Sequence, residues 1–246
     1  MSGRCKLLAA GAVLGALAAA CVLHPRPAAA PANAPPAAAA PGALAAHLGA
    51  PYDVVAQESL LTILVYRGGT LASAGHNHVI ASHDLSGTIY VPADPLLASF
   101  ELHVPVTTLT VDEAALRAQQ PSADFPPDLS EGARLGTRHN MLGPALLDAD
   151  HSPEIVLRAL RTEPSTEAAG VLARLECTVR GQPHTLAVPV HYERGGGEVV
   201  VSGELPLKQS DLGLTPFSAL LGALQVQDEM RVSFRIVARG AMPRAQ

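Results

Sequence analysis

The 246-residue sequence contains three cysteines, no tryptophan and only 3% aromatic residues. Cys5 and Cys21 lie in an apolar N-terminal stretch, which leaves Cys177 as the one cysteine in the patterned part of the chain. A single cysteine there excludes an internal disulfide. Because Cys177 falls on the apolar side of a strand pattern, we expect a buried thiol and not a catalytic nucleophile.

The chain also has little charge, since Asp, Glu, Lys and Arg make up 16% of its residues. Residues 1–20 hold two of the 17 Lys and Arg residues and none of the 22 Asp and Glu residues, so the remainder has a net charge of −7. Mild acidity without a basic cluster argues against nucleic acid and against anionic membrane surfaces as partners.

Three catalytic or metal-binding motifs are missing from the sequence. It has no His-Glu-X-X-His and no Cys-X-X-Cys, which are typical of metal sites, and no Gly-X-Ser-X-Gly, which is typical of hydrolases. Together with the strand pattern and the aliphatic interior described below, these absences predict a protein that is not an enzyme and that needs no cofactor.

The first fifty residues differ from the rest because they are rich in Ala, Pro, Gly and Leu. Residues 1–20 have the plan of a signal peptide, with Arg4 and Lys6 before an apolar run; an uncleaved membrane anchor is the alternative. The run before Cys21 is similar to a bacterial lipobox, so we predict acylation of Cys21, against ordinary cleavage after Ala30. Localisation is then the periplasm or cell envelope.

A Pro/Ala-rich linker is expected over residues 21–50, with a reach of about 85 Å if it is extended. The folded domain is expected over residues 51–240, followed by a tail at 241–246. If Cys21 is acylated, we expect the protein to contact a membrane through this lipid anchor. A homodimer is a further possibility that the sequence does not decide.

Apolar and polar residues alternate over most of this domain, with glycine and proline between the runs. The predicted strands are Ser59–Tyr66, Asp84–Val91, Ser99–Val111, Glu154–Arg161, Gly170–Arg180, His184–Glu193, Glu198–Leu207 and Glu229–Ala238. Short glycine turns join the later strands as antiparallel hairpins. We therefore predict an all-β fold, an antiparallel eight-stranded barrel of the lipocalin-like kind, because closure removes exposed edges.

The one long interruption lies between Asp112 and Pro153. Glu113–Gln119 and Leu129–Leu142 have helical composition, and Asp128 or Ser130 is a suitable cap. An insertion of about forty residues with helical character predicts a lid or end-cap on the barrel. With so few aromatic side chains, the walls consist mainly of Val, Leu, Ile and Ala, which leave room for one small ligand; a filled core is the alternative.

The stretch Arg67–Ile80 joins two apolar runs through glycines and contains His76, Asn77 and His78. Residues two apart share a face of an extended chain, so both imidazoles are expected on the same side. We predict that Arg67, His76, Asn77 and His78 contact the polar end of a ligand. Hydrogen bonding of both histidines to the glycine loop is the structural alternative.

A metal site is the second functional hypothesis. His76 and His78 would share the ion, and at least one further ligand would be needed. The sequence offers these candidates for that ligand: His83, Asp84, His139 and His151.

Several short stretches resemble the YceI-like family of exported bacterial lipid-binding proteins, over roughly Tyr52 to Ala238. They are Glu58–Ile63, Leu85–Ile89, Ser152–Leu157, Arg180–Thr185 and Lys208–Leu214. Two features depart from the family pattern: Leu212 stands where an aromatic residue is usual, and Gly75-His76-Asn77-His78 replaces a glycine-aromatic pattern.

The resemblance implies a lipocalin-like barrel whose lumen holds a long amphiphile. The expected ligand is a polyisoprenoid or a quinone-like lipid, and the Gly-His-Asn-His segment places this chain in a histidine-bearing branch of the family.

Overall fold

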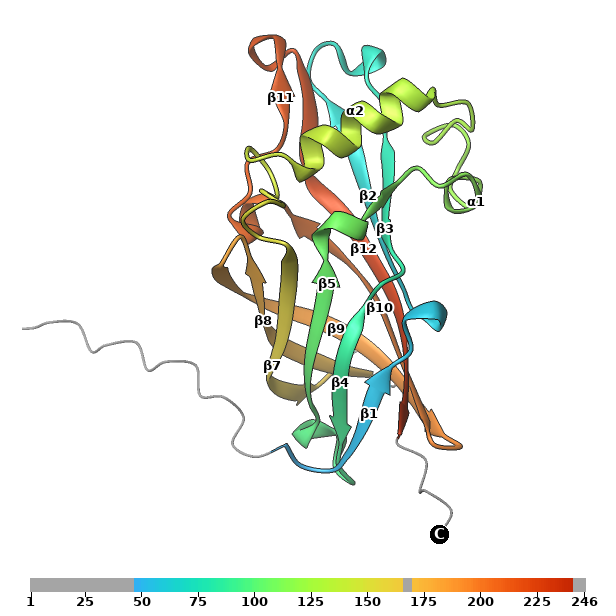
Figure 1. Cartoon of the computed structure of the whole chain (residues 1–246), viewed down its shortest axis with the longest axis vertical. Helices are drawn as coiled ribbons and strands as arrows, with labels where there is room; N and C mark the ends of the chain where they lie inside the picture. The colour runs from blue at the N-terminus through green and yellow to red at the C-terminus, as the bar shows by residue number, and fades with distance from the viewer. Residues whose placement is uncertain (1–46, 166–169, 241–246) are drawn as a thin grey trace, which may run out of the picture. The chain divides into compact units, whose positions relative to one another are not determined.

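The computed structural model describes residues 47–165 and 170–240, which fold into a β-barrel (Figure 1). The strands are β1 (Ala50–Val54), β2 (Leu60–Gly68), β3 (His78–Ser82), β4 (Ser86–Val91), β5 (Ser99–Pro105), β6 (Thr110–Val111), β7 (Glu154–Pro164), β8 (Gly170–Val179), β9 (Gln182–Gly195), β10 (Glu198–Lys208), β11 (Ser218–Ala219) and β12 (Leu224–Gly240). The expected leader, Cys21 and the tail at 241–246 lie outside the described residues, as does most of the expected linker.

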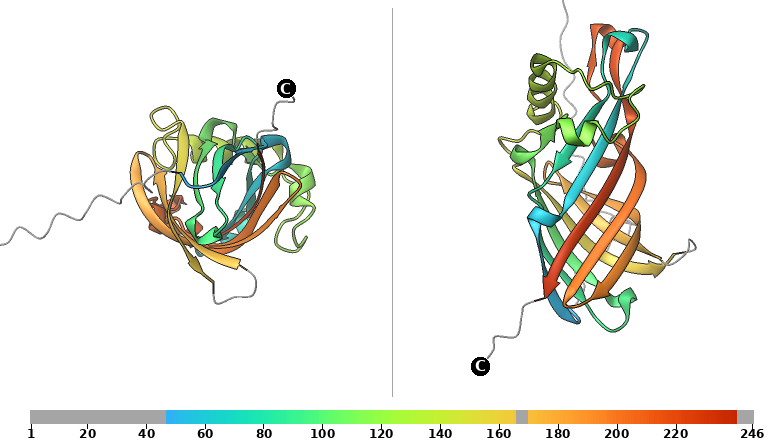
Figure 2. Two further views of the ribbon diagram at one scale, coloured as in Figure 1. Left: turned by 90° about the horizontal axis from the view of Figure 1, so that it is seen from below. Right: turned by 90° about the vertical axis from the view of Figure 1, so that its right-hand side faces the viewer.

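The barrel closes through β1, which pairs with β4 on one side and with β12 on the other. The ring runs β1-β4-β5-β7-β8-β9-β10-β12, and every one of its pairings is antiparallel. This confirms the predicted antiparallel eight-stranded barrel. The left view of Figure 2 looks along the barrel and shows its strands running round a common axis.

At one end the barrel is extended by β2, which pairs with β12, and then by β3 and β6. The long strand predicted from Ser99 to Val111 is therefore two strands, β5 and β6. A 3₁₀ turn at Val106–Thr108 separates them, and it follows Pro105. β5 pairs with β7, whereas β6 pairs with β3. The break therefore lets one continuous segment of chain join two different neighbouring strands.

The helical insertion lies at this end, which we call the helix end (Figure 1). It contains α1 (Ala114–Arg117) and α2 (Glu131–Leu142), so both helices are shorter than predicted. The Ser130 hydroxyl accepts a hydrogen bond from the Ala133 N–H at 3.2 Å and caps α2. In the part of the chain that the structure covers, no helix is long and apolar enough to cross a membrane.

The pleat places alternate side chains of each strand inside and outside the barrel. On β12, Met230 and Ile236 are buried and Arg231 and Arg235 are exposed, as the alternation predicts. β3 is buried on both faces, because its outer residues Val79 and Ala81 are covered by Leu116 and Phe125. We call these four residues the outer cluster; it lies apart from the main core inside the barrel.

Candidate functional site

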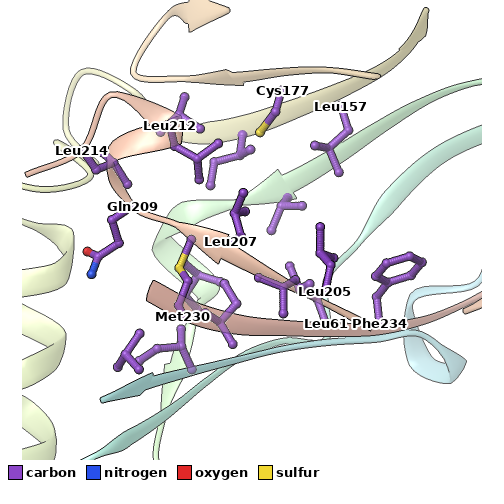
Figure 3. Close-up of a pocket in the computed structure, with 18 of the residues that line it drawn as sticks. Leu61, Leu157, Cys177, Leu205, Leu207, Gln209, Leu212, Leu214, Met230 and Phe234 are labelled. Atoms are coloured by element: carbon purple, nitrogen blue, oxygen red, sulfur yellow. The ribbon is translucent and has the colours of Figure 1, made fainter. Parts of the chain in front are cut away.

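The barrel contains a cavity of about 630 Å³. Its walls come from nearly every strand and from α2, and they are mostly aliphatic. Figure 3 shows Leu157, Cys177, Leu205, Leu207 and Met230 around a common space. The interior is therefore hollow, as the scarcity of aromatic residues predicts.

Cys177 is part of this wall and is 4% exposed. Burial raises the pKa of its thiol to about 12. At neutral pH the side chain is a neutral thiol, which behaves as a small apolar group and not as a nucleophile.

The cavity is most open to solvent at the helix end. The exposed lining residues there are Arg67, Ala74, His76, Gly132, Gly136, Asn140, Phe217 and Gln225, whereas Tyr192 is exposed near the opposite end. α2 contributes glycines and Ala133 to this rim, so the helix covers the mouth without filling it. The predicted end-cap is thus a partial lid.

Of the four predicted ligand residues, Arg67, His76 and His78 line the cavity. The rings of His76 and His78 have their centroids 6.3 Å apart, so the two histidines share one side of the chain as expected. The Arg67 guanidinium donates from Nη1 to the Gly75 carbonyl at 3.0 Å, which holds it across the glycine loop at the mouth.

Asn77 takes a different part in the structure from the one predicted. Its side chain is 6% exposed and does not line the cavity. Its Oδ1 accepts from the Arg67 backbone N–H at 2.9 Å, and its Nδ2 donates to the Asp124 carbonyl at 2.9 Å. Because its neighbours His76 and His78 face the lumen, Asn77 faces the opposite side and fixes the loop.

Asp112 contacts His78 on the side of the ring that faces away from the cavity. The sequence pattern did not predict this residue as part of the site. The His78 Nδ1 lies 2.6 Å from Asp112 Oδ2, and the other carboxylate oxygen accepts from the Val79 N–H at 2.9 Å. Asp112 is 2% exposed. A carboxylate can only accept hydrogen bonds, so Nδ1 of His78 carries a proton, and in the neutral form of the ring Nε2 is an acceptor.

Arg117 balances the buried charge of Asp112. Its Nη1 donates to Asp112 Oδ1 at 2.7 Å and to the Asn77 carbonyl at 2.9 Å, while its Nε donates to the Pro126 carbonyl at 2.7 Å. The Phe125 ring lies 5.6 Å from the guanidinium carbon. Each hydrogen bond limits the cost of burying the two charges.

These contacts set the pKa values around the mouth. Burial alone would raise the pKa of the Asp112 carboxyl, but the hydrogen bonds from His78 and Val79, the charge of His78 when it is protonated and the charge of Arg117 hold it below the usual value. Burial lowers the pKa of His76, and the positive charges of His78, when that ring is protonated, and of Arg117 and Arg67 lower it further. Asp112 therefore stays ionised at neutral pH, and His76 is biased toward its neutral form.

Thr137 on α2 completes a chain of polar groups at the mouth. Its Oγ1 lies 3.2 Å from His78 Nε2, and both residues line the cavity. With Nε2 as an acceptor, the Thr137 hydroxyl donates to it and keeps its oxygen lone pairs free to accept. We call this series Thr137–His78–Asp112 the relay.

No signal in the sequence marked Asp112 as the partner of His78. Asp112 lies 34 residues after His78 and has a positive φ of 54° that strand and helix patterns do not predict. Arg117 follows it by five residues, within a helix of only four residues. Only the pairing of β3 with β6 brings the three together.

The candidates for a metal ligand do not gather around the two histidines. His83 pairs with Glu113 at 2.9 Å, and His151 pairs with Asp148 at 2.9 Å. Over residues 47–165 and 170–240, no group of three or more His, Cys, Asp or Glu side chains is placed to hold a metal ion.

Comparisons with known proteins agree with this fold. The family model of the YceI-like domain matches residues 52–238. BcnA of Burkholderia cenocepacia has a similar structure with a TM-score of 0.54 at 17% identity, covering 75% of this chain and 99% of that chain. A polyisoprenoid-binding domain from Saccharophagus degradans, implicated in plant cell wall breakdown, has a TM-score of 0.51 at 12% identity, covering 77% and 98%. No curated protein matches the sequence.

Proposed function

The chain belongs to the YceI-like domain family, and from this premise we propose that it is a binding protein that holds one long apolar lipid in the barrel lumen. The observation that carries the proposal is the aliphatic cavity of about 630 Å³. That volume falls within the ~300–1,000 Å³ typical of small-molecule sites. The polyisoprenoid named for the Saccharophagus degradans domain supports a ligand of this class.

An apolar chain suits these walls energetically. Each methylene that leaves water contributes about 0.8 kcal/mol, so a ligand of isoprenoid length gains affinity without any directed contact. Because Val, Leu and Ile side chains dominate the lining, the lumen selects for an aliphatic chain and leaves the choice of head group to the mouth.

The relay supports a head group with a hydroxyl. When the His78 ring is neutral, the Thr137 hydroxyl donates to its Nε2, and the Thr137 oxygen is then free to accept a hydrogen bond in the cavity. A ligand hydroxyl would therefore donate to Thr137 and extend the series toward the Asp112 carboxylate. Arg67 and His76, at the same rim, are placed to bind the ligand oxygen or a second polar group.

The order Thr137–His78–Asp112 is that of a nucleophile, a base and an acid, yet the surroundings favour binding over hydrolysis. Thr137 sits inside α2, where backbone N–H groups already donate within the helix. An oxyanion needs free donors of that kind beside the nucleophile. The proposal therefore assigns the relay to recognition.

We test the lumen and the relay together with geranylgeraniol, a twenty-carbon isoprenoid alcohol, and with its methyl ether. The wild-type chain should bind both, and the alcohol about tenfold more tightly, which is the size of one hydrogen bond. In Thr137→Val, which removes the hydroxyl at nearly constant volume, the two affinities should become equal.

The two claims fail separately in this titration. If the wild-type chain binds neither compound, the lumen is not a lipid site. If it binds both equally well, the lumen holds lipid but the relay does not recognise the hydroxyl group of the ligand. His103→Ala is a matched control, because His103 lies on β5 outside the cavity and pairs with Glu154 at 2.9 Å.

We further propose that the domain is exported and tethered to a membrane through acylated Cys21. The signal-like residues 1–20 and the lipobox-like run before Cys21 support this. Mass spectrometry of the mature N-terminus tests it. A lipid-modified Cys21 at the first position is expected, and an unmodified N-terminus elsewhere would contradict the tether.

A further inference from the structure

Two loops extend beyond the barrel at the helix end (Figure 1). One joins β2 to β3 and includes residues 69–75; the other runs from Leu212 through β11 into β12. The Leu71 N–H donates to the Ala223 carbonyl at 2.8 Å, and Gly68 pairs with Gln225, so the loops form one unit. We call this unit the tip.

The tip carries no ionisable charge. Neither residues 68–75 nor residues 212–227 contain an Asp, Glu, Lys or Arg, although these types make up 16% of the whole chain. The nearest charged residues border it: Arg67 precedes the first loop, and Asp211 and Asp228 flank the second. The absence of charge is therefore confined to the part that projects.

Most of the large apolar side chains exposed in the described residues gather at the tip or beside it. Leu220 is 68% exposed and Leu221 is fully exposed; the others at this end are Leu71, Phe217 and Leu135 of α2. Leu220 and Leu221 also have positive φ angles of 52° and 55°, where glycine or asparagine is usual. Exposure to water and a positive φ both disfavour leucine, so neither explains why two leucines stand at these positions.

The tip adjoins the mouth of the cavity. Phe217 and Leu224 line the cavity, and Leu220 and Leu221 lie between them in the chain. The two most exposed leucines of the tip thus lie within a few residues of side chains that line the cavity.

We propose that the tip inserts into the apolar region of a lipid bilayer, so that the mouth of the cavity opens onto the membrane. The fit is to neutral lipid, because the tip has no cationic group to bind anionic head groups. A large uncharged aliphatic projection suits hydrocarbon better than a protein surface, where a polar rim is usual. The reason for docking rests on the proposed function: a long lipid can enter the lumen without crossing water.

The test is flotation of the protein with vesicles of pure phosphatidylcholine. The chain should bind them, and binding should persist when the salt concentration is raised, because burial of leucine is not screened. Leu220→Ser/Leu221→Ser should lower the partition coefficient at least tenfold, since each leucine transferred from water is worth about that factor or more. Leu97→Ser is the matched control, because Leu97 is 50% exposed and lies at the opposite end.

The apolar residues 7–20 of the full chain would themselves bind vesicles. The measurement is therefore repeated with the chain beginning at Pro41, since every strand of the closed barrel follows that residue. The same tenfold loss is expected there.

Three results would overturn the proposal. They are equal binding by the double variant and the wild type, binding that high salt abolishes, and a wild-type dimer that the double variant lacks, which would make the tip a self-association surface. Binding of geranylgeraniol in solution should be the same in both proteins. A double variant that no longer binds vesicles but still binds geranylgeraniol supports docking of the tip. A wild-type chain that binds vesicles but not geranylgeraniol refutes only the proposed function.

Discussion

The two faces of β3 are both buried, but what they face differs. On the inner face, His78 and Ile80 line a cavity of about 630 Å³. On the outer face, Val79 and Ala81 belong to the outer cluster with Leu116 and Phe125, and none of these four lines the cavity. The hollow side is almost entirely apolar, whereas the covered side contains the buried pair Asp112 and Arg117.

We infer from this difference that the inner side of β3 serves ligand binding and the outer side serves the stability of the fold. A hollow lumen gives space to a ligand, so its walls should tolerate changes in size that alter affinity. The outer side positions charged groups that reach the lumen only through His78, so changes there should unfold the protein before they alter specificity.

The largest effect is expected from Arg117→Ala. It leaves the Asp112 carboxylate buried without its counter-ion and should lower the free energy of unfolding by about 3–5 kcal/mol. Urea denaturation measures this. Arg231→Ala is the control, since its pair with Glu204 at 2.8 Å is exposed and should contribute less than about 1 kcal/mol. Equal losses in the two variants would contradict the distinction between the covered side and the surface.

A smaller effect on stability, but a large one on binding, is expected from Val188→Trp. Val188 is 6% exposed and lines the cavity, so the indole should occupy the lumen and lower the affinity for geranylgeraniol about 100-fold. Because a cavity of about 630 Å³ has room for the ring, the free energy of unfolding should change by less than about 1.5 kcal/mol. Ala187→Trp, on the exposed face of the same strand, should change neither. A Val188→Trp protein that binds normally would show that the lumen is not the site.

The smallest effect is a pH dependence. The pKa of Asp112 is lower in the folded protein than in the unfolded chain, where it is about 3.9. Its carboxylate therefore stabilises the fold fully above the unfolded value, and that stability is lost as the pH falls through the folded value. Asp112→Asn should show a shallower loss of stability below about pH 4. Parallel curves in urea denaturation between about pH 2.5 and 6 would contradict this.

The barrel could be predicted because strand alternation is a local property. The residues expected inward on β5 and β12 are inward, and Ser130 caps α2 as one of the two predicted caps. The position of His76 and His78 on one side of the chain likewise follows from the two-residue period of an extended segment.

The relay could not be predicted, because its members meet only through tertiary structure. His78, Asp112 and Thr137 come from β3, the end of β6 and α2, and no spacing links them. Its position beside glycine-rich turns predicts Asn77 among the ligand residues, yet the same two-residue period turns its side chain the other way. Strand alternation shows only whether a residue is polar or apolar. It therefore did not predict that Asp112 and Arg117 are buried on the outer side of β3.

Native mass spectrometry of the chain with geranylgeraniol tests the central claim most directly. The barrel should bind one alcohol per wild-type chain, and Val188→Trp should remain unliganded at the same concentration. A wild-type chain that stays unliganded at saturating alcohol, or a Val188→Trp chain that carries the same single adduct, would contradict a lipid site in the lumen.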